Sequence, residues 1–136
     1  MDGMAAPAHT HKENTLMDIN KTLKELKQAP GFTEHVGMML VHNGVVRGWA
    51  RKDHAPVTRV TVTPDRDKMA AICREMEQRP GIFKILAEAA EGELAPGDDL
   101  LFLVVAGDIR ENVKATFAEL LDRIKSEAVV KQEFND

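Results

Sequence analysis

The chain has 136 residues, the size of one ordinary domain, and a formal net charge of −4 at pH 7. It lacks tyrosine, has few other aromatic residues and shows no dense basic stripe, so we expect no nucleic-acid partner. The sequence has no apolar run of about 18 residues, so we expect no contact with a membrane. Its single cysteine, Cys73, cannot form an internal disulfide, as is typical of a cytoplasmic protein.

The N-terminal region predicts a tail followed by a single folded unit. Residues 1–13 are small and polar and have no hydrophobic periodicity, so we expect a flexible tail. No repeat and no linker divides the rest of the chain, which indicates one domain over residues 14–136. Apolar residues recur at three- and four-residue steps in residues 16–28, which predicts a first helix with Asn14 as its N-cap.

Strand signals follow this helix. Residues 37–41 and 44–50 are short apolar runs, and the Asn43-Gly44 pair between them is a strong turn signal. We therefore expect a β-hairpin or a bulged pair of strands in this region. Residues 57–63 alternate between two faces, which is typical of a half-buried strand.

The segment after this strand predicts a second helix. Thr63 is the expected cap, and Pro64 suits the first helical position. Cys73 falls on the apolar stripe of the helix, so we interpret it as a core residue and not as a reactive thiol. The predicted buried stripe is Met69, Ile72, Cys73 and Met76.

The last third of the chain completes an α+β pattern. Residues 82–94 fit either a strand with an irregular edge or a short helix, and both interpretations stay open. The strongly apolar residues 100–107 predict a central strand. The last helix is expected to begin at Asp108, with Glu111 as the second member of a capping-box-like pair. Its predicted buried face is Val113, Phe117, Leu120, Leu121 and Ile124.

Basic residues at both ends of this last helix are candidates for an anion site. On a helical wheel Arg110 points into the apolar face, and Lys125 lies about 60° round, on the rim. The wheel alone favours cationic side chains that extend along an apolar edge into water. Arg110 and Lys125 are about 22 Å apart along the helix, so one chain cannot bring both to a small ligand. Either the two residues are unrelated, or a two-fold dimer shares one site between its subunits.

Several motifs occur here in a recognisable order. A Gly-Glu-Leu-x-x-Gly-Asp turn in residues 92–98 precedes the apolar strand, Arg110 opens the helix, and Lys125 and Lys131 follow near its end. Upstream, the segment HNGVVRG supplies Arg47. In order and spacing these motifs resemble the large, catalytic subunit of molybdopterin synthase.

The resemblance extends over roughly residues 37–133 and implies a fold and an activity. The fold is an α/β-hammerhead-like domain with a mainly antiparallel sheet, here with an extra N-terminal helix, and it forms a homodimer. The implied activity is a step of molybdenum cofactor biosynthesis in the cytoplasm. A ubiquitin-like small subunit inserts its Gly-Gly C-terminus, carried as a thiocarboxylate, and the sulfur passes to cyclic pyranopterin monophosphate to build molybdopterin. We expect neither a metal nor a bound cofactor in the large subunit.

By analogy with the family, the basic residues divide into two roles. Lys125 and Lys131 belong to the sulfur-transfer site, where Lys131 would handle the C-terminus of the partner or the acyl intermediate. Arg47 and Arg110 would hold the anionic groups of the substrate, because arginine suits planar, bidentate recognition of phosphate.

Three positions depart from the pattern of the family. Its histidine before the arginine is Ile109 here, an aromatic residue of its strand is His42, and an arginine after the second lysine is Gln132. We favour an active synthase subunit. A degenerate paralogue that binds a ubiquitin-like partner or regulates the pathway without catalysis is the alternative, and a structural α+β protein with solvated lysines is a third hypothesis.

Overall fold

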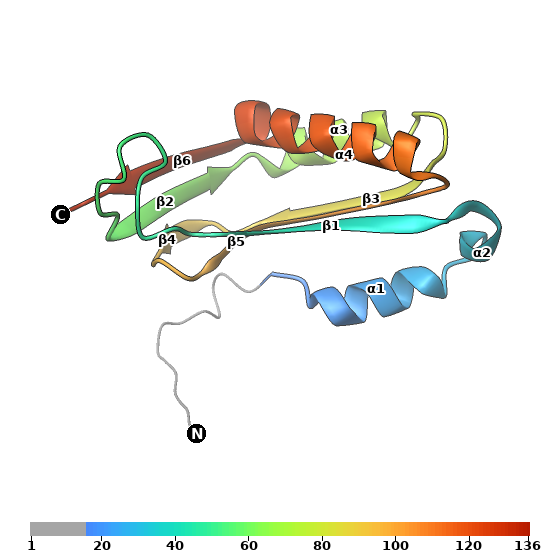
Figure 1. Ribbon diagram of the computed structural model, residues 1–136, viewed down its shortest axis with the longest axis horizontal. Coiled ribbons are helices and arrows are strands. Elements are labelled where there is room, and N and C mark those ends of the chain that lie inside the picture. Colours follow the sequence, from blue (N-terminus) through green and yellow to red (C-terminus); the bar gives the residue numbers. More distant parts are fainter. Residues whose placement is uncertain (1–15) are drawn as a thin grey trace, which may run out of the picture.

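The computed structural model describes residues 16–136, which form two three-stranded sheets and the helices that accompany them (Figure 1). The strand orders are β1-β5-β3 and β4-β2-β6, and every neighbouring pair is antiparallel. The strands are β1 (Met38–Val45), β2 (Arg59–Pro64), β3 (Ile82–Ala89), β4 (Gly92–Leu94), β5 (Asp99–Gly107) and β6 (Val129–Phe134).

The helices lie on both sides of the β1-β5-β3 sheet. They are α1 (Ile19–Lys27), α2 (Phe32–His35), α3 (Arg66–Met76) and α4 (Arg110–Arg123), and a π-helical segment, η3 (Ile124–Ala128), continues α4. α3 and α4 cover one face of the sheet, and α1 lies on the opposite side (Figure 1). The predicted α+β class, with antiparallel sheets and an added N-terminal helix, is confirmed. Within residues 16–136, no helix has the length and apolarity to cross a membrane.

The main core lies between the β1-β5-β3 sheet and helices α3 and α4. β5 is the central strand, as its apolar sequence predicts, and its residues 101–107 are all buried. Leu103 and Val105 of this strand pack in one cluster with buried residues of α3 and α4. The segment that the sequence left open is resolved as the strands β3 and β4. The buried residues predicted for α3 and α4 lie in or against this core, with Cys73, Phe117 and Leu121 only partly buried.

Of the two alternatives expected around Asn43-Gly44, the hairpin is wrong, and the structure has instead a register shift in the pairing of β1 with β5. β1 runs straight through these two residues, which pair with Phe102 and Leu101 of β5, and the register shifts only between Gly44 and Val45. The reason is the partner strand, because β5 offers a long row of backbone groups that a tight turn would leave unpaired. Pairing along β5 therefore overrides the local turn preference.

The predicted helix starts also differ in detail. α1 begins at Ile19, where the Asp18 carboxylate accepts a hydrogen bond from the Lys21 amide at 3.1 Å, and Asn14 lies outside the described residues, as does the predicted tail. α3 is capped by Asp65 and not by Thr63, because Pro64 still belongs to β2. These carboxylates satisfy amide groups that have no partner within the helix.

α4 begins at Arg110, and the expected pair between Asp108 and Glu111 does not form. Asp108 Oδ1 accepts hydrogen bonds from the Ile109 amide at 2.6 Å and from Asn112 Nδ2 at 2.9 Å. Glu111 instead lies 3.8 Å from the Arg110 guanidinium. These bonds hold the turn before α4, and the capping-box prediction is wrong.

Cys73 should be unreactive in the folded chain. Burial, assisted by the nearby charge of Glu77, raises the pKa of its thiol from 9.0 to about 11. Because the thiolate is the nucleophile, native protein at pH 8 should alkylate about 100-fold more slowly than urea-unfolded protein, as measured by mass spectrometry with iodoacetamide. The unfolded chain loses this proton first, so the free energy of unfolding should also fall as the pH rises from 9.0 to about 11. Equal alkylation rates in the two states would contradict the packing of this helix.

Candidate anion-binding site

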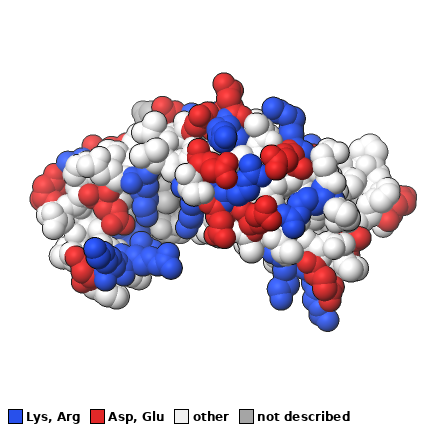
Figure 2. Space-filling model, turned by 90° about the horizontal axis from the view of Figure 1, so that it is seen from above, with Lys and Arg blue, Asp and Glu red and all other residues white. Residues whose placement is uncertain are grey.

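Four cationic side chains from three separate segments gather at one end of the molecule. We call Arg47, Arg51, Lys125 and Lys131 the basic cluster: the arginines lie in the loop between β1 and β2, Lys125 lies in η3, and Lys131 lies in β6. Figure 2, which views the molecule from the side of α3 and α4, shows blue side chains gathered at its left, the end where β2 and β6 lie in Figure 1. The fold therefore creates a local positive region on an acidic chain.

Lys125 is the member whose pKa responds to the others. Desolvation by the surrounding protein lowers the pKa of its ammonium group most, and the positive charges of Lys131, Arg47 and Arg51 lower it further. Asp122 opposes this shift. A lysine with a lowered pKa among other cations can hold an anion and can also exchange a proton more readily than a solvated lysine.

The local backbone explains how Lys125 reaches the cluster. In η3 the helix widens to π geometry, a feature often found at functional sites. Ile124 and Ala128 are buried and anchor this segment, whereas Lys125 is exposed between them. Beyond η3, β6 pairs with β2, and Lys131 lies opposite Val62.

A single carboxylate bridges two members of the basic cluster. Glu133 Oε2 lies 3.7 Å from Arg47 Nη2 and 3.6 Å from Lys131 Nζ. Lys131 and Glu133 are two residues apart on one strand, so they project from the same face of the sheet. All three side chains are partly solvent-exposed, so these ion pairs are weak and an incoming anion can compete with Glu133 for both cations.

Trp49 orients Arg47, a role that the sequence did not reveal. The Arg47 guanidinium carbon lies 4.9 Å from the centre of the Trp49 ring, and Arg47 Nε donates a hydrogen bond to the Trp49 carbonyl at 3.3 Å. Trp49 in turn stacks on His54, with the ring centres 4.9 Å apart. The indole is 43% exposed, so it contributes little to the core and instead restricts the guanidinium by a cation–π contact.

Arg110 is absent from the basic cluster. It lies at the opposite end of α4, with its side chain 77% exposed and its only described ion pair formed with Glu111. The expectation that it points into the apolar face is therefore wrong. Within one chain the structure brings together Arg47, Lys125 and Lys131, and it leaves Arg110 on a separate surface beside Gly37 and Met38.

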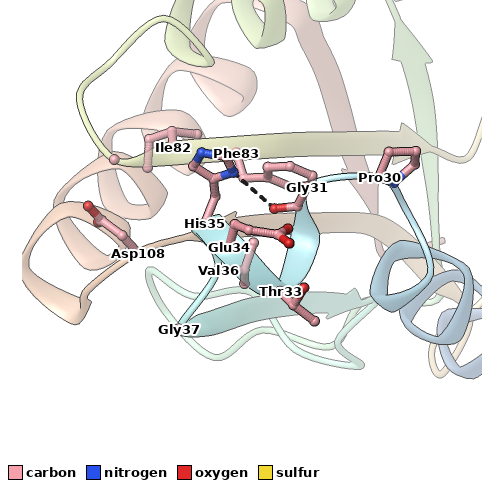
Figure 3. A pocket seen from close by; sticks show the side chains of 11 residues that line it. Pro30, Gly31, Thr33, Glu34, His35, Val36, Gly37, Ile82, Phe83 and Asp108 are labelled. Carbon is pink, nitrogen blue, oxygen red and sulfur yellow. Dashed lines mark hydrogen bonds between the residues drawn. The ribbon is translucent and has the colours of Figure 1, made fainter.

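A hollow near α2 differs in chemical character from the basic cluster (Figure 3). Its polar lining includes the carboxylates of Glu34 and Asp108 and no lysine or arginine. His35 donates from Nδ1 to the Gly31 carbonyl at 2.9 Å, and its ring stacks on Phe83. Without cations, and with two carboxylates, this hollow is unsuited to a phosphate or a carboxylate ligand. The basic cluster is therefore the candidate functional site.

The two antiparallel sheets, the two helices on one face (Figure 1) and the basic cluster together form an α+β domain with a candidate anion-binding site. The model of the MoaE protein family matches residues 12–127, and the chain belongs to this family. The expected resemblance to the large subunit of molybdopterin synthase is thereby confirmed.

Solved structures share this fold. Molybdopterin cofactor biosynthesis protein E from Burkholderia multivorans superposes with a TM-score of 0.70 at 20% identity, covering 90% of this chain and 84% of that one. Molybdopterin synthase from Staphylococcus aureus superposes with a TM-score of 0.64 at 20% identity, covering 74% of this chain and 76% of that one. A chain in a complex of subunits 1 and 2 of molybdopterin-converting factor from Helicobacter pylori superposes with a TM-score of 0.63 at 16% identity. The match covers 86% of this chain and 78% of that one. At such identities the similarity shows the fold alone.

One curated relative is similar in sequence. A probable molybdopterin synthase from Haloferax volcanii is 26% identical over 131 residues, which amount to 93% of this chain and 49% of the relative. The chain therefore spans about half the length of that relative. The rest of the longer protein has no counterpart in the match, so its complete activity does not carry over to this chain by similarity alone.

Proposed function

We propose that this chain is the catalytic subunit of a molybdopterin synthase in the cytoplasm. It would transfer sulfur from the C-terminal thiocarboxylate of a ubiquitin-like small subunit to cyclic pyranopterin monophosphate, and so form molybdopterin. The observation that carries the proposal is the convergence of Arg47, Lys125 and Lys131 from three segments onto one place. Membership of the MoaE family supports it.

The chemistry of this reaction requires both arginine and lysine side chains. The substrate carries a phosphate and the thiocarboxylate is an anion, so both need positive charge in the pocket. Arg47 offers a planar guanidinium for phosphate, held by Trp49. Lys125, with its lowered pKa, is suited to general acid–base catalysis, and Lys131 on the exposed strand β6 would receive the C-terminus of the small subunit.

The homodimer is part of the same proposal. Arg110 lies at one end of α4, and the basic cluster of the same chain lies at the other end. Arg110 can therefore contribute only to the basic cluster of a second copy of the chain. A two-fold axis would generate two equivalent shared sites. Analytical ultracentrifugation should therefore show a dimer, and a strictly monomeric chain would exclude Arg110 from the site. The solved complex of two subunits from Helicobacter pylori supports a small partner as well.

A reconstitution tests the activity. The purified chain is mixed with a thiocarboxylated small subunit and cyclic pyranopterin monophosphate, and the dithiolene product is followed by mass spectrometry. We expect product at a rate that depends on the thiocarboxylate. No product, with a known synthase subunit active in parallel, would reject catalysis.

The departures of the chain from the family pattern favour one alternative, a non-catalytic paralogue that binds the small partner or regulates the pathway. Ile109, where the family has histidine, is 54% exposed and provides no charge. Gln132, which is exposed beside Lys131, also provides no charge. This alternative predicts binding of the small subunit, measurable by calorimetry, without product. If neither binding nor product is found, both functions are rejected.

A further inference from the structure

His42 lies on β1 at the edge of the basic cluster and faces α4. It pairs with Leu103 of β5, and Leu40, two residues earlier on the same face, packs against the core beneath α4. The centre of its ring lies 6.4 Å from that of Phe117 on α4. A Cβ atom at Gly44 would lie 2.8 Å from His42 Nε2, so the imidazole extends over this glycine toward the end of β1 that leads to Arg47.

The imidazole has a buried nitrogen with no partner. His42 Nε2 is shielded from solvent and forms no hydrogen bond to any described residue. Buried polar atoms nearly always have a partner, so His42 Nε2 needs one from a water molecule, a side-chain movement or a ligand. Burial, and secondarily the charge of Lys125, lower the pKa of His42, so the ring is neutral at physiological pH and keeps one lone pair.

Lys125 has hydrogen-bond donors without a partner, whereas His42 has an acceptor without one. Among residues 16–136, its ammonium group forms no hydrogen bond and no ion pair, although it carries three donors. The charged groups that face it are Lys131 from β6, Arg47 and Arg51 from the loop after β1, and Asp122 from α4. Three of these repel it and Asp122 attracts it, and His42 on β1 offers an uncharged acceptor, Nε2, that has no partner among the described residues.

We propose that His42 is a positioning residue for Lys125, whose ammonium donates a hydrogen bond to the buried Nε2 of the neutral imidazole. The flexible lysine side chain would form this bond by rotation, and the bond would direct the two remaining N–H donors into the basic cluster. The bond would hold Lys125 at a fixed depth against the repulsion of its cationic neighbours. The inference deepens the proposed function, since it concerns a residue assigned there, but its test requires neither substrate nor the small partner.

The test is a titration of Lys125 by NMR on protein labelled with 13C at the ε-carbon of lysine, with the signal assigned from Lys125→Arg. An acceptor stabilises the charged lysine, so His42→Phe, which keeps the ring volume but loses the acceptor, should lower the Lys125 pKa by about one unit. His42→Gln, whose amide oxygen reaches the position of Nε2, should restore the wild-type value. An unchanged pKa in His42→Phe would overturn the proposal. So would an equal decrease in both variants, which would show an effect of ring removal and not of the acceptor.

The reciprocal measurement uses the imidazole. The 15N shifts of His42 should show an unprotonated Nε2, and Lys125→Met should raise the His42 pKa because it removes a nearby positive charge. A protonated Nε2 in the neutral ring, or a His42 pKa unaffected by Lys125→Met, would overturn the assignment. If the titrations give the expected pKa changes but the sulfur-transfer assay gives no product, the hydrogen bond between Lys125 and His42 is supported and only the proposed activity is rejected.

Discussion

Replacement of Lys125 by alanine should lower the rate of dithiolene formation by about 10²–10⁴-fold, the usual contribution of a positioned acid–base group. Lys125 has the lowered pKa and lies where Lys131, Arg47 and Arg51 converge. Its side chain is exposed, so the free energy of unfolding should change by about 0.5 kcal/mol or less. The measurement combines single-turnover product formation with urea unfolding of the same variant.

A matched control is available on α4, the helix that η3 continues. Lys114 is an exposed lysine of α4 outside the basic cluster, and Lys114→Ala should leave the rate of product formation near that of the wild type. Equal losses of activity in the two variants would show that general positive charge, and not the cluster, supports the reaction. An active Lys125→Ala would remove this lysine from the mechanism and leave Lys131 as the candidate.

The same variant tests whether the site is shared between subunits. Arg110→Ala and Lys125→Ala should each be inactive alone, since every site in either homodimer lacks one residue. In a randomly mixed dimer, one of the two sites regains both native residues, so mixing should recover about a quarter of the wild-type activity. Recovery requires that Arg110 acts on the cluster of its partner. No recovery, with exchange of subunits verified by mass spectrometry, would place Arg110 outside the site.

The elements that sequence reasoning located are those whose signal is local. β5 was predicted because its apolar run is unbroken, and α3 and α4 because their apolar residues recur at helical spacing. The errors arose where two local signals competed. Asn43-Gly44 is a turn signal that pairing with β5 overrides, and Thr63 and Asp65 are both acceptable caps, so only the length of β2 decides between them.

The site was less accessible to sequence reasoning than the fold. Arg47 and Lys131 are brought together by sheet pairing between distant segments, which no local pattern records, and the resemblance to a family indicated them instead. The π geometry of η3 covers too few residues to disturb the helical period, so the placement of Lys125 was not predictable. His42 was missed for another reason: the incorrect hairpin interrupted the alternation that places it on the face toward α4.

Stability should depend most on the central strand that supports this site. Leu103 is fully buried in β5, paired with His42 of β1 on one side and Ala87 of β3 on the other, and it packs beneath α3 and α4. Leu103→Ala leaves a cavity in the core, and the strands paired on both sides of β5 cannot move to fill it. The substitution should therefore lower the free energy of unfolding by about 2–5 kcal/mol. That loss is a large part of the roughly 5–15 kcal/mol that stabilises a typical domain.

The control for this substitution is an apolar truncation in the other sheet. Val130 of β6 is 69% exposed, so Val130→Ala should change the free energy of unfolding by about 0.5 kcal/mol or less, measured by urea denaturation monitored by circular dichroism. Leu103→Ala should shift the urea midpoint without changing the slope of the transition, because the folded chain buries nearly the same surface. A loss below about 1 kcal/mol in Leu103→Ala would contradict the close packing of α4 on β5. It would also weaken the case for the site, because α4 carries η3, and η3 places Lys125 beside Arg47 and Lys131.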